Sequence, residues 1–122
     1  MDYRFPKRMR LLRPTEFARV MAARMSCVDG MLRVYGVAND LGHPRLGLTV
    51  SRKVGGAVER TRWKRALREA FRLEQHRLPA LDIVCLPHRT ATADVHQLRL
   101  SLPKLARQLE TRLAARRERA QP

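Results

Sequence analysis

The chain has 122 residues, which suits one domain with a modest hydrophobic core. Hydrophobic residues make up 44% of it, so a largely disordered chain is excluded. Its charge is unusual, because 26 basic side chains stand against 11 acidic ones and leave a net charge of +15. Self-repulsion of this size destabilises a compact state, and a polyanionic partner would relieve it. Most of the cations are arginine, whose guanidinium pairs with phosphate and stacks on bases, so the composition favours nucleic acid as the partner.

A short helix is predicted near the N-terminus. Proline followed by threonine is typical of a helix start, and Thr15 is expected to be the N-cap. Phe17, Val20 and Met21 then recur with the spacing of one helical side, and the helix is expected to end around Ala23.

Two strands are predicted next, over residues 31–38 and 45–51. The segment between them, residues 39–44, is rich in turn-forming residues, so the two strands are expected to pair as an antiparallel hairpin. Alternate residues of a strand point to the same side of a sheet. Arg33 and Tyr35 are therefore expected to share one face of the first strand.

The main helix is predicted over residues 57–77, after a loop that ends at Gly55 and Gly56. Apolar residues recur along it with the spacing of a core-facing stripe, and they are Trp63, Ala66, Leu67, Ala70 and Phe71. The adjoining side presents cations, namely Arg60, Lys64, Arg65, Arg68 and Arg72. Cations near the N-terminal end oppose the helix macrodipole, so their position favours a role in contacting phosphate.

The rest of the chain completes one domain. Residues 81–86 form a short apolar run typical of a buried strand, and Asp94 is predicted to cap a final leucine-rich helix. The expected order is α-β-β-α-β-α, an α+β fold with a small sheet and a single domain over residues 1–122. The basic lead-in, residues 1–13, and the tail, residues 116–122, are expected to be flexible.

Several other classes of site are disfavoured. Cys27 and Cys85 lie in apolar contexts and are predicted to be buried free thiols. The histidines lack ligand spacing and the carboxylates are scattered, so neither a metal site nor a two-metal nuclease site is expected in the protein itself. No apolar run approaches the ~20 residues that span a bilayer, and the N-terminus lacks a signal-peptide core. A cytoplasmic protein with no membrane partner is expected.

The region around the start of the main helix resembles a known family. The residues that carry the resemblance are Gly47-Leu48-Thr49-Val50-Ser51-Arg52-Lys53-Val54-Gly55-Gly56-Ala57-Val58, followed by Arg60-Thr61-Arg62-Trp63-Lys64-Arg65. This run is similar to the signature of bacterial ribonuclease P protein subunits. Phe17, Tyr35 and the Asp82-Ile83-Val84 segment continue the match in order, so nearly the whole chain aligns apart from its two ends.

The resemblance implies a fold and an activity. The fold would be a small sheet with a left-handed β-α-β crossover, similar to a domain of a small-subunit ribosomal protein. The activity would be that of a protein subunit of an endoribonuclease, a hydrolase that removes the 5′ leader from precursor tRNA. Its RNA subunit would carry the catalysis with Mg²⁺, so the protein would have no catalytic residues, bind no cofactor by itself and be inactive alone. The implied partners are the ribonuclease P RNA subunit and precursor tRNA, with no DNA.

The resemblance also implies two binding surfaces. The surface for the RNA subunit would comprise Arg52, Lys53, Arg60, Thr61, Arg62, Lys64, Arg65, Arg68 and Arg72. A cleft between the first helix and the sheet would bind the leader through Phe17, Met21, Arg33, Tyr35, Thr49 and Lys53. A face that mixes arginine and tyrosine suits single-stranded RNA with stacked bases. Residue type alone favours a different interpretation, in which Phe17 and Tyr35 belong to the core and Arg33 lies at a sheet edge.

Three residues depart from the family pattern. Thr61 replaces an asparagine and offers fewer hydrogen-bond donors, Gly56 replaces a longer polar residue, and Met21 replaces an aromatic residue that would stack more firmly.

Two alternative functions fit parts of the pattern. A ribosomal-protein-like RNA binder would need the basic helix but not the cleft. A membrane-surface or calmodulin-binding helix is disfavoured, because the main helix lies between strands and its apolar face is needed for the core.

Overall fold

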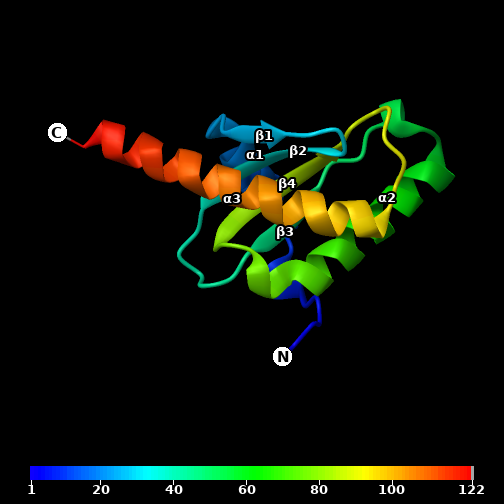
Figure 1. The fold of residues 1–122 in the computed structure, drawn as a ribbon, viewed down its shortest axis with the longest axis horizontal. Helices are drawn as coiled ribbons and strands as arrows, with labels where there is room; N and C mark the ends of the chain where they lie inside the picture. The colour runs from blue at the N-terminus through cyan, green and yellow to red at the C-terminus, as the bar shows by residue number, and fades with distance from the viewer. Residues whose placement is uncertain (122) are drawn as a thin grey trace.

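The computed structural model describes residues 1–121. Its main elements are α1 (Pro14–Ala22), β1 (Ser26–Val28), β2 (Leu32–Ala38), β3 (Arg45–Leu48), α2 (Ala57–Glu74), β4 (Leu81–Pro87) and α3 (Val95–Ala120). Single turns of 3-10 helix occur at η1 (Lys7–Met9), η2 (Arg52–Val54) and η3 (Gln75–Arg77). The four strands form one sheet in the order β1-β2-β4-β3 (Figure 1). The result is the small α+β fold that the sequence predicts.

The strand pairing differs from the expected hairpin. β2 pairs antiparallel with β4, and β3 pairs parallel with β4 on its other side. The turn residues after β2 mark a reversal of the chain, but they do not decide which strand becomes the neighbour. β4, the most apolar strand, lies inside the sheet between β2 and β3, where helices cover both of its faces. The β3–α2–β4 connection is the β-α-β crossover.

A third strand ahead of α2 was not predicted. β1 has three residues, too few to show the alternation that identifies a strand. It pairs antiparallel with β2 and forms the edge of the sheet. The element order is therefore α-β-β-β-α-β-α, and the predicted order α-β-β-α-β-α is wrong by this one strand.

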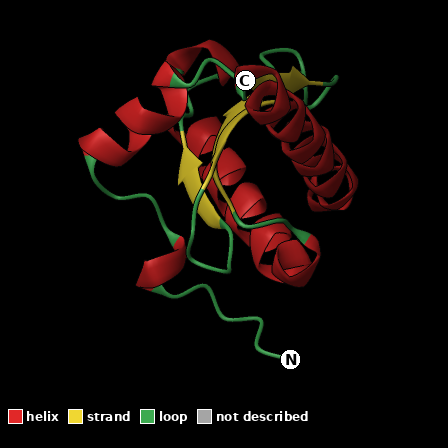
Figure 2. Cartoon of the chain, turned by 90° about the vertical axis from the view of Figure 1, so that its left-hand side faces the viewer, coloured by secondary structure: helices red, strands yellow, loops and turns green. Residues whose placement is uncertain are grey.

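Helices cover both faces of the sheet, as Figure 2 shows. α2 and α3 pack against one face, where Trp63, Phe71 and Leu102 are completely or almost completely buried. The predicted apolar stripe of α2 is confirmed, since all five of its residues are buried. α1 lies on the opposite face and contributes Val20 to a smaller cluster that includes Val84.

The start of α1 differs from the prediction that Thr15 is its N-cap. The N-cap is Arg13 and the helix begins at Pro14, two residues earlier than predicted, because proline has no N–H to lose in the first turn. The Glu16 carboxylate reaches back and accepts hydrogen bonds from the backbone N–H groups of Leu12 and Arg13, each at 2.9 Å. The cap is therefore made by a residue inside the helix.

The N-terminal lead-in lies against the domain, whereas the described residues of the tail after Arg116 are exposed. In the lead-in, residues 1–13, Met9 and Leu11 are buried and the ring of Phe5 lies 5.2 Å from that of Phe71. α3 includes most of the tail and ends at Ala120, and Pro122 lies outside the described residues. None of the helices in residues 1–121 is long and apolar enough to cross a bilayer.

Both cysteines are free and buried, as predicted. Burial raises the pKa of the Cys85 thiol to about 12, so this group remains protonated at neutral pH. It contributes as a small apolar side chain.

Candidate nucleic-acid interface

Side chains on the α1 side of the sheet are arranged in rows that cross the strands. The strand register aligns Val37 with Asp82 and Asp82 with Arg45. The next row on the same face consists of Tyr35, Val84 and Gly47, and the third aligns Arg33 with Leu86. The first row contains the ionic residues Asp82 and Arg45, and the second row is mainly apolar. The third row, with the exposed Arg33, lies at the solvent-exposed end of this face, which we call the open end.

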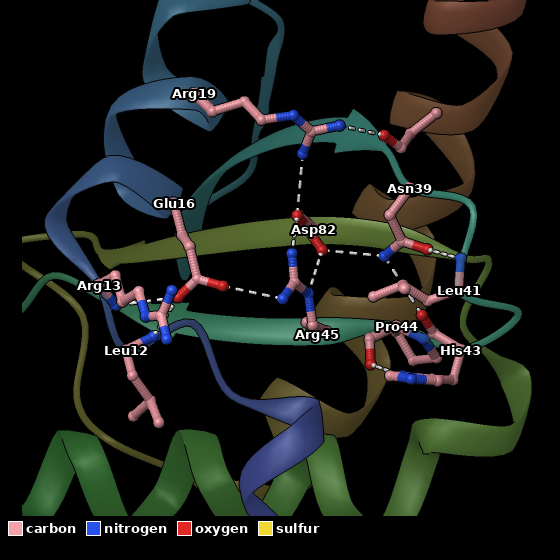
Figure 3. A network of polar contacts seen from close by, with 11 residues as sticks. Leu12, Arg13, Glu16, Arg19, Asn39, Leu41, His43, Pro44, Arg45 and Asp82 are labelled. Atoms are coloured by element: carbon pink, nitrogen blue, oxygen red, sulfur yellow. Dashed lines mark hydrogen bonds and ion pairs between the residues drawn. The ribbon is translucent and has the colours of Figure 1, made fainter.

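The ionic row fastens α1 to the sheet (Figure 3). Asp82 is completely buried and accepts two hydrogen bonds from Arg45, at 2.8 and 2.7 Å, and one from Asn39 at 2.9 Å. Arg19 of α1 donates to the same carboxylate at 2.9 Å. Arg45 also donates to Glu16 of α1 at 2.8 Å. The helix is thus attached to the sheet through both Arg19 and Glu16.

The surrounding cations keep these carboxylates ionised. Burial acts to raise the pKa of Asp82, but hydrogen bonds from Arg45 and Asn39 and the charges of Arg45 and Arg19 outweigh it. The pKa of Asp82 is consequently lowered from its ordinary value of 3.8. Backbone hydrogen bonds from Arg13 and Leu12 lower the pKa of Glu16 as well. At neutral pH the attachment of α1 is fully charged.

Sequence reasoning missed this network, although one signal for it was present. Asp82 is the single acidic residue in an otherwise apolar strand, and a buried carboxylate requires cationic or hydrogen-bonding partners. Its partners Arg19 and Arg45 are far from it in the sequence. They are ordinary members of a very basic chain, so only the fold distinguishes them.

The apolar row holds an aromatic ring of α1 close to the backbone of β3. A Cβ atom added to Gly47 would lie 2.7 Å from Cε1 and 2.9 Å from Cζ of Phe17. Phe17 belongs to the same apolar cluster as Tyr35 and Leu86, and all three are half-buried. Two members of the predicted cleft are therefore brought together, with the ring of Phe17 seated where only glycine leaves room.

We expect Gly47→Ala to displace Phe17 and to lower the free energy of unfolding by roughly 1–3 kcal/mol, because overpacking forces the ring from its position. Chemical denaturation would measure the change. Gly30→Ala is the matched control, since a Cβ there meets nothing within 4 Å. Equal stability of the two variants would contradict the close approach of Phe17 to β3.

The remaining residues of the predicted cleft lie at the open end or around it. Arg33 is exposed and donates to the Ser26 hydroxyl at 3.1 Å. Thr49 follows β3 directly, and its N–H donates to the Cys85 carbonyl at 3.0 Å. Met21 is 37% exposed on α1, and Lys53 is exposed on η2. The structure thus places all six predicted residues on α1, the α1 face of the sheet or the loop after β3.

The predicted basic surface occupies η2 and one side of α2. Two of its arginines are engaged within the helix, since Arg62 pairs with Glu59 at 2.7 Å and Arg72 pairs with Glu69. Within residues 1–121, the other six cations have no carboxylate within 4.0 Å, and they are Arg52, Lys53, Arg60, Lys64, Arg65 and Arg68. Their charges therefore remain available to an external anion.

The loop before α2 depends on one glycine conformation. Gly55 has φ 137°, a backbone region that residues with a side chain rarely adopt, and a Cβ there would lie 2.8 Å from Cβ of Glu59. It turns the chain from η2 into α2. Gly56, by contrast, is exposed with nothing within 4 Å, so a longer polar residue would fit there.

A groove of about 240 Å³ joins the two predicted surfaces. Lys64 and Arg68 of α2 line it together with Phe17 of α1, and Leu48 contributes from β3. A second hollow, of about 400 Å³, lies at the N-terminal part of α2 and is lined by Thr61, Arg62 and Arg65 with two small apolar neighbours. In the groove, cations of α2 and an aromatic ring of the cleft therefore face one depression.

Comparison with known proteins identifies the family. A family model described as Ribonuclease P matches residues 5–110, most of the chain. The chain belongs to the ribonuclease P protein family. The ribonuclease P protein component of Proteus mirabilis strain HI4320 is 46% identical over 105 residues, which cover 84% of this chain and 88% of the relative. The corresponding protein of Escherichia coli O157:H7 is 44% identical over the same shares of the two chains.

Solved structures of ribonuclease P proteins share the fold. The Staphylococcus aureus protein superposes with a TM-score of 0.71 at 31% identity, covering 81% of this chain and 93% of that one. The Thermotoga maritima protein superposes with a TM-score of 0.70 at 28% identity, covering 81% and 96%. As a ribonuclease P protein component, the chain is a subunit of an endoribonuclease complex that functions in tRNA processing.

Proposed function

We propose that this ribonuclease P protein binds the catalytic RNA subunit through its basic surface and the 5′ leader of precursor tRNA in the cleft beside α1. The observation that carries the proposal is the groove in which Lys64 and Arg68 meet Phe17. Phosphates attract unpaired cations regardless of sequence, and unpaired bases stack on exposed aromatic rings. A site with both features suits a junction between the RNA subunit and a single-stranded leader.

The chemistry would belong to the RNA. The carboxylates beside the cleft, Glu16 and Asp82, are engaged by Arg45 and by other donors, so they are poorly placed to ligate a metal ion. Mg²⁺, when bound, would stabilise the charge that develops at the cleaved phosphate, and it would be held by the RNA subunit. The protein would bind and orient the leader and screen RNA repulsion in the assembled particle, which we place in the cytoplasm.

Cleavage of a 5′-labelled precursor tRNA with Mg²⁺ near physiological salt tests this function. We would compare the protein alone, a bacterial ribonuclease P RNA alone, and the two together. We expect efficient cleavage at the mature 5′ end only in the mixture. Cleavage by the protein alone would contradict the proposal that the RNA subunit carries out catalysis. Tight RNA binding with no gain in cleavage would favour a purely structural RNA-binding role.

Tyr35→Ala is expected to lower the affinity of the assembled enzyme for precursor tRNA by roughly ten-fold, because stacking on one base contributes about 1–3 kcal/mol. The affinity for mature tRNA should not change, since it has no leader. Binding of both RNAs by the reconstituted enzyme would be measured side by side. If both lost affinity equally, Tyr35 would have a structural role only.

A further inference from the structure

The C-terminal part of α3 lies beyond the region that matches the family. The family model ends at residue 110, whereas α3 continues to Ala120. This extension contains the arginines Arg112, Arg116, Arg117 and Arg119. Figure 1 shows it running past β1 and projecting beyond the sheet. Its charge is a feature of this chain that the family match does not explain.

Two of these arginines donate hydrogen bonds to backbone carbonyls in the edge strand β1 and in the loop before it. Arg112 donates from Nη1 to the carbonyl of Ser26 in the edge strand at 2.9 Å. Arg116 donates to the carbonyl of Ala23, in the loop between α1 and β1. Both acceptors are neutral, and no carboxylate within residues 1–121 lies within 4.0 Å of either guanidinium. The two positive charges are therefore held in place without being neutralised.

This edge is continuous with the open row of the cleft. Ser26 accepts a hydrogen bond from Arg33 at its hydroxyl and another from Arg112 at its carbonyl. Arg33 lies on the α1 face of the sheet, and Arg112 reaches the same residue from α3 on the other side. Val28, the register partner of Arg33, is 51% exposed on the same edge strand. Arg33, Arg112 and Arg116 thus form a line of cations that runs from the cleft around the edge strand, with the exposed Val28 beside it.

We infer that this line, the edge path of Arg33, Arg112 and Arg116, binds the part of the leader that lies upstream of the nucleotides in the cleft. The inference rests on the proposed function of the cleft. The path bends from a sheet face around an edge to a helix, and a flexible single strand can follow such a bend whereas a stiff duplex cannot. Because its guanidinium groups would contact phosphates and not bases, the edge path would bind leaders of any sequence.

Precursor tRNAs with leaders of increasing length test the edge path. The enzyme would be reconstituted with a bacterial ribonuclease P RNA, and affinity would be measured at several salt concentrations. The variant is R112Q/R116Q, in which each glutamine keeps an amide donor for the backbone carbonyl but removes the charge. The matched control is R107Q/R117Q, which makes the same charge change on the same helix. Arg117 lines a hollow with Ala38 and Ala80, at a different part of the surface.

We expect R112Q/R116Q to bind the longest leaders about ten-fold more weakly and the shortest as well as the unmodified enzyme does. The salt slope for long leaders should fall by about 1.4, because each phosphate contact to single-stranded nucleic acid contributes about 0.7. The control should keep the unmodified profile. Arg119→Glu places a carboxylate one helical turn beyond Arg116, where it can pair with that arginine and repel phosphate, so it should show the same length-dependent loss with Arg112 unchanged.

Three outcomes would overturn the inference. One is an unchanged profile in both R112Q/R116Q and Arg119→Glu. Another is an equal loss for every leader length and for mature tRNA, which would place the contact on the tRNA body or the RNA subunit. The third is an equal loss in the control, which would indicate a net-charge effect. If no leader of any length raised the affinity of the unmodified enzyme above that for mature tRNA, the proposed function of the cleft would fail as well. Failure of the edge path alone is therefore distinguishable from failure of the cleft.

Discussion

Asp82→Asn is expected to lower the free energy of unfolding by roughly 3 kcal/mol, because removal of one partner from a buried ion pair leaves the other charge uncompensated. Arg45 is 20% exposed at its side chain and would keep only Glu16 as an ionic partner. Arg19 would lose its carboxylate altogether. Urea denaturation at neutral pH would measure the change. The same substitution at the exposed Asp40 is the control and should have little effect.

The stability difference between Asp82→Asn and the unmodified protein should depend on pH. The pKa of Asp82 is lower in the folded protein than its ordinary value of 3.8, so the unfolded chain takes up a proton first as pH falls. The contribution of Asp82 is therefore complete above about pH 5 and is lost as pH falls through its folded pKa. Between neutral pH and about pH 3, the difference in stability between the two proteins should narrow once the pH falls below about 5. A constant difference over this range would mean that the charge of Asp82 is not what holds α1.

Loss of α1 from the sheet would also affect the candidate leader site. α1 supplies Phe17, and the ionic row lies directly beside the row of Tyr35 and Gly47. The side chain of Asp82 is 0% exposed, and its ion pairs hold α1, which forms one wall of the open cleft. We therefore expect Asp82→Asn to weaken RNA binding that depends on the leader, as well as to lower stability.

R65A/R68A is expected to weaken assembly with the RNA subunit by about ten- to a hundred-fold, because both side chains are exposed cations of α2 and, within residues 1–121, have no carboxylate partner. The salt slope should fall by about 0.7–0.9 for each phosphate that the variant no longer neutralises. Equilibrium binding to a bacterial ribonuclease P RNA across a range of salt would measure both quantities. R107A/R117A changes the net charge equally and should have a much smaller effect.

An unchanged affinity and salt slope in R65A/R68A would contradict the assignment of the basic surface. An equal loss in both double variants would mean that net charge, rather than this face of α2, attracts the RNA. Arg62 and Arg72 are poor choices for this experiment. Each already pairs with a glutamate three residues earlier, so its removal would also release an acidic side chain beside the RNA.

Local patterns predicted the helices well. The apolar stripe of α2 repeats from Trp63 to Phe71, and each of its residues is buried as predicted. Asp94 caps α3 as predicted, since its carboxylate accepts from the N–H groups of His96 and Gln97. Signals of this kind succeed because the interactions that they report join residues within one or two helical turns.

The sequence by itself determined the kind of partner and the element that meets it. A net charge of +15 and a helix with one apolar and one basic side follow from residue types and spacing alone. The family signature around residues 47–65 likewise lies in one continuous stretch.

Only the tertiary structure decided how the strands pair and what holds the cleft together. Three sets of interactions join residues that are distant in the sequence. They are the pairing of β4 with β2 and β3, the ion pairs of Arg19 and Arg45 with Asp82, and the hydrogen bond from Arg112 to Ser26. Nothing in the local sequence separates these arginines from the many others in the chain. Their roles are set by which backbone the fold brings within hydrogen-bonding distance, and that depends on how the whole chain buries its apolar surface.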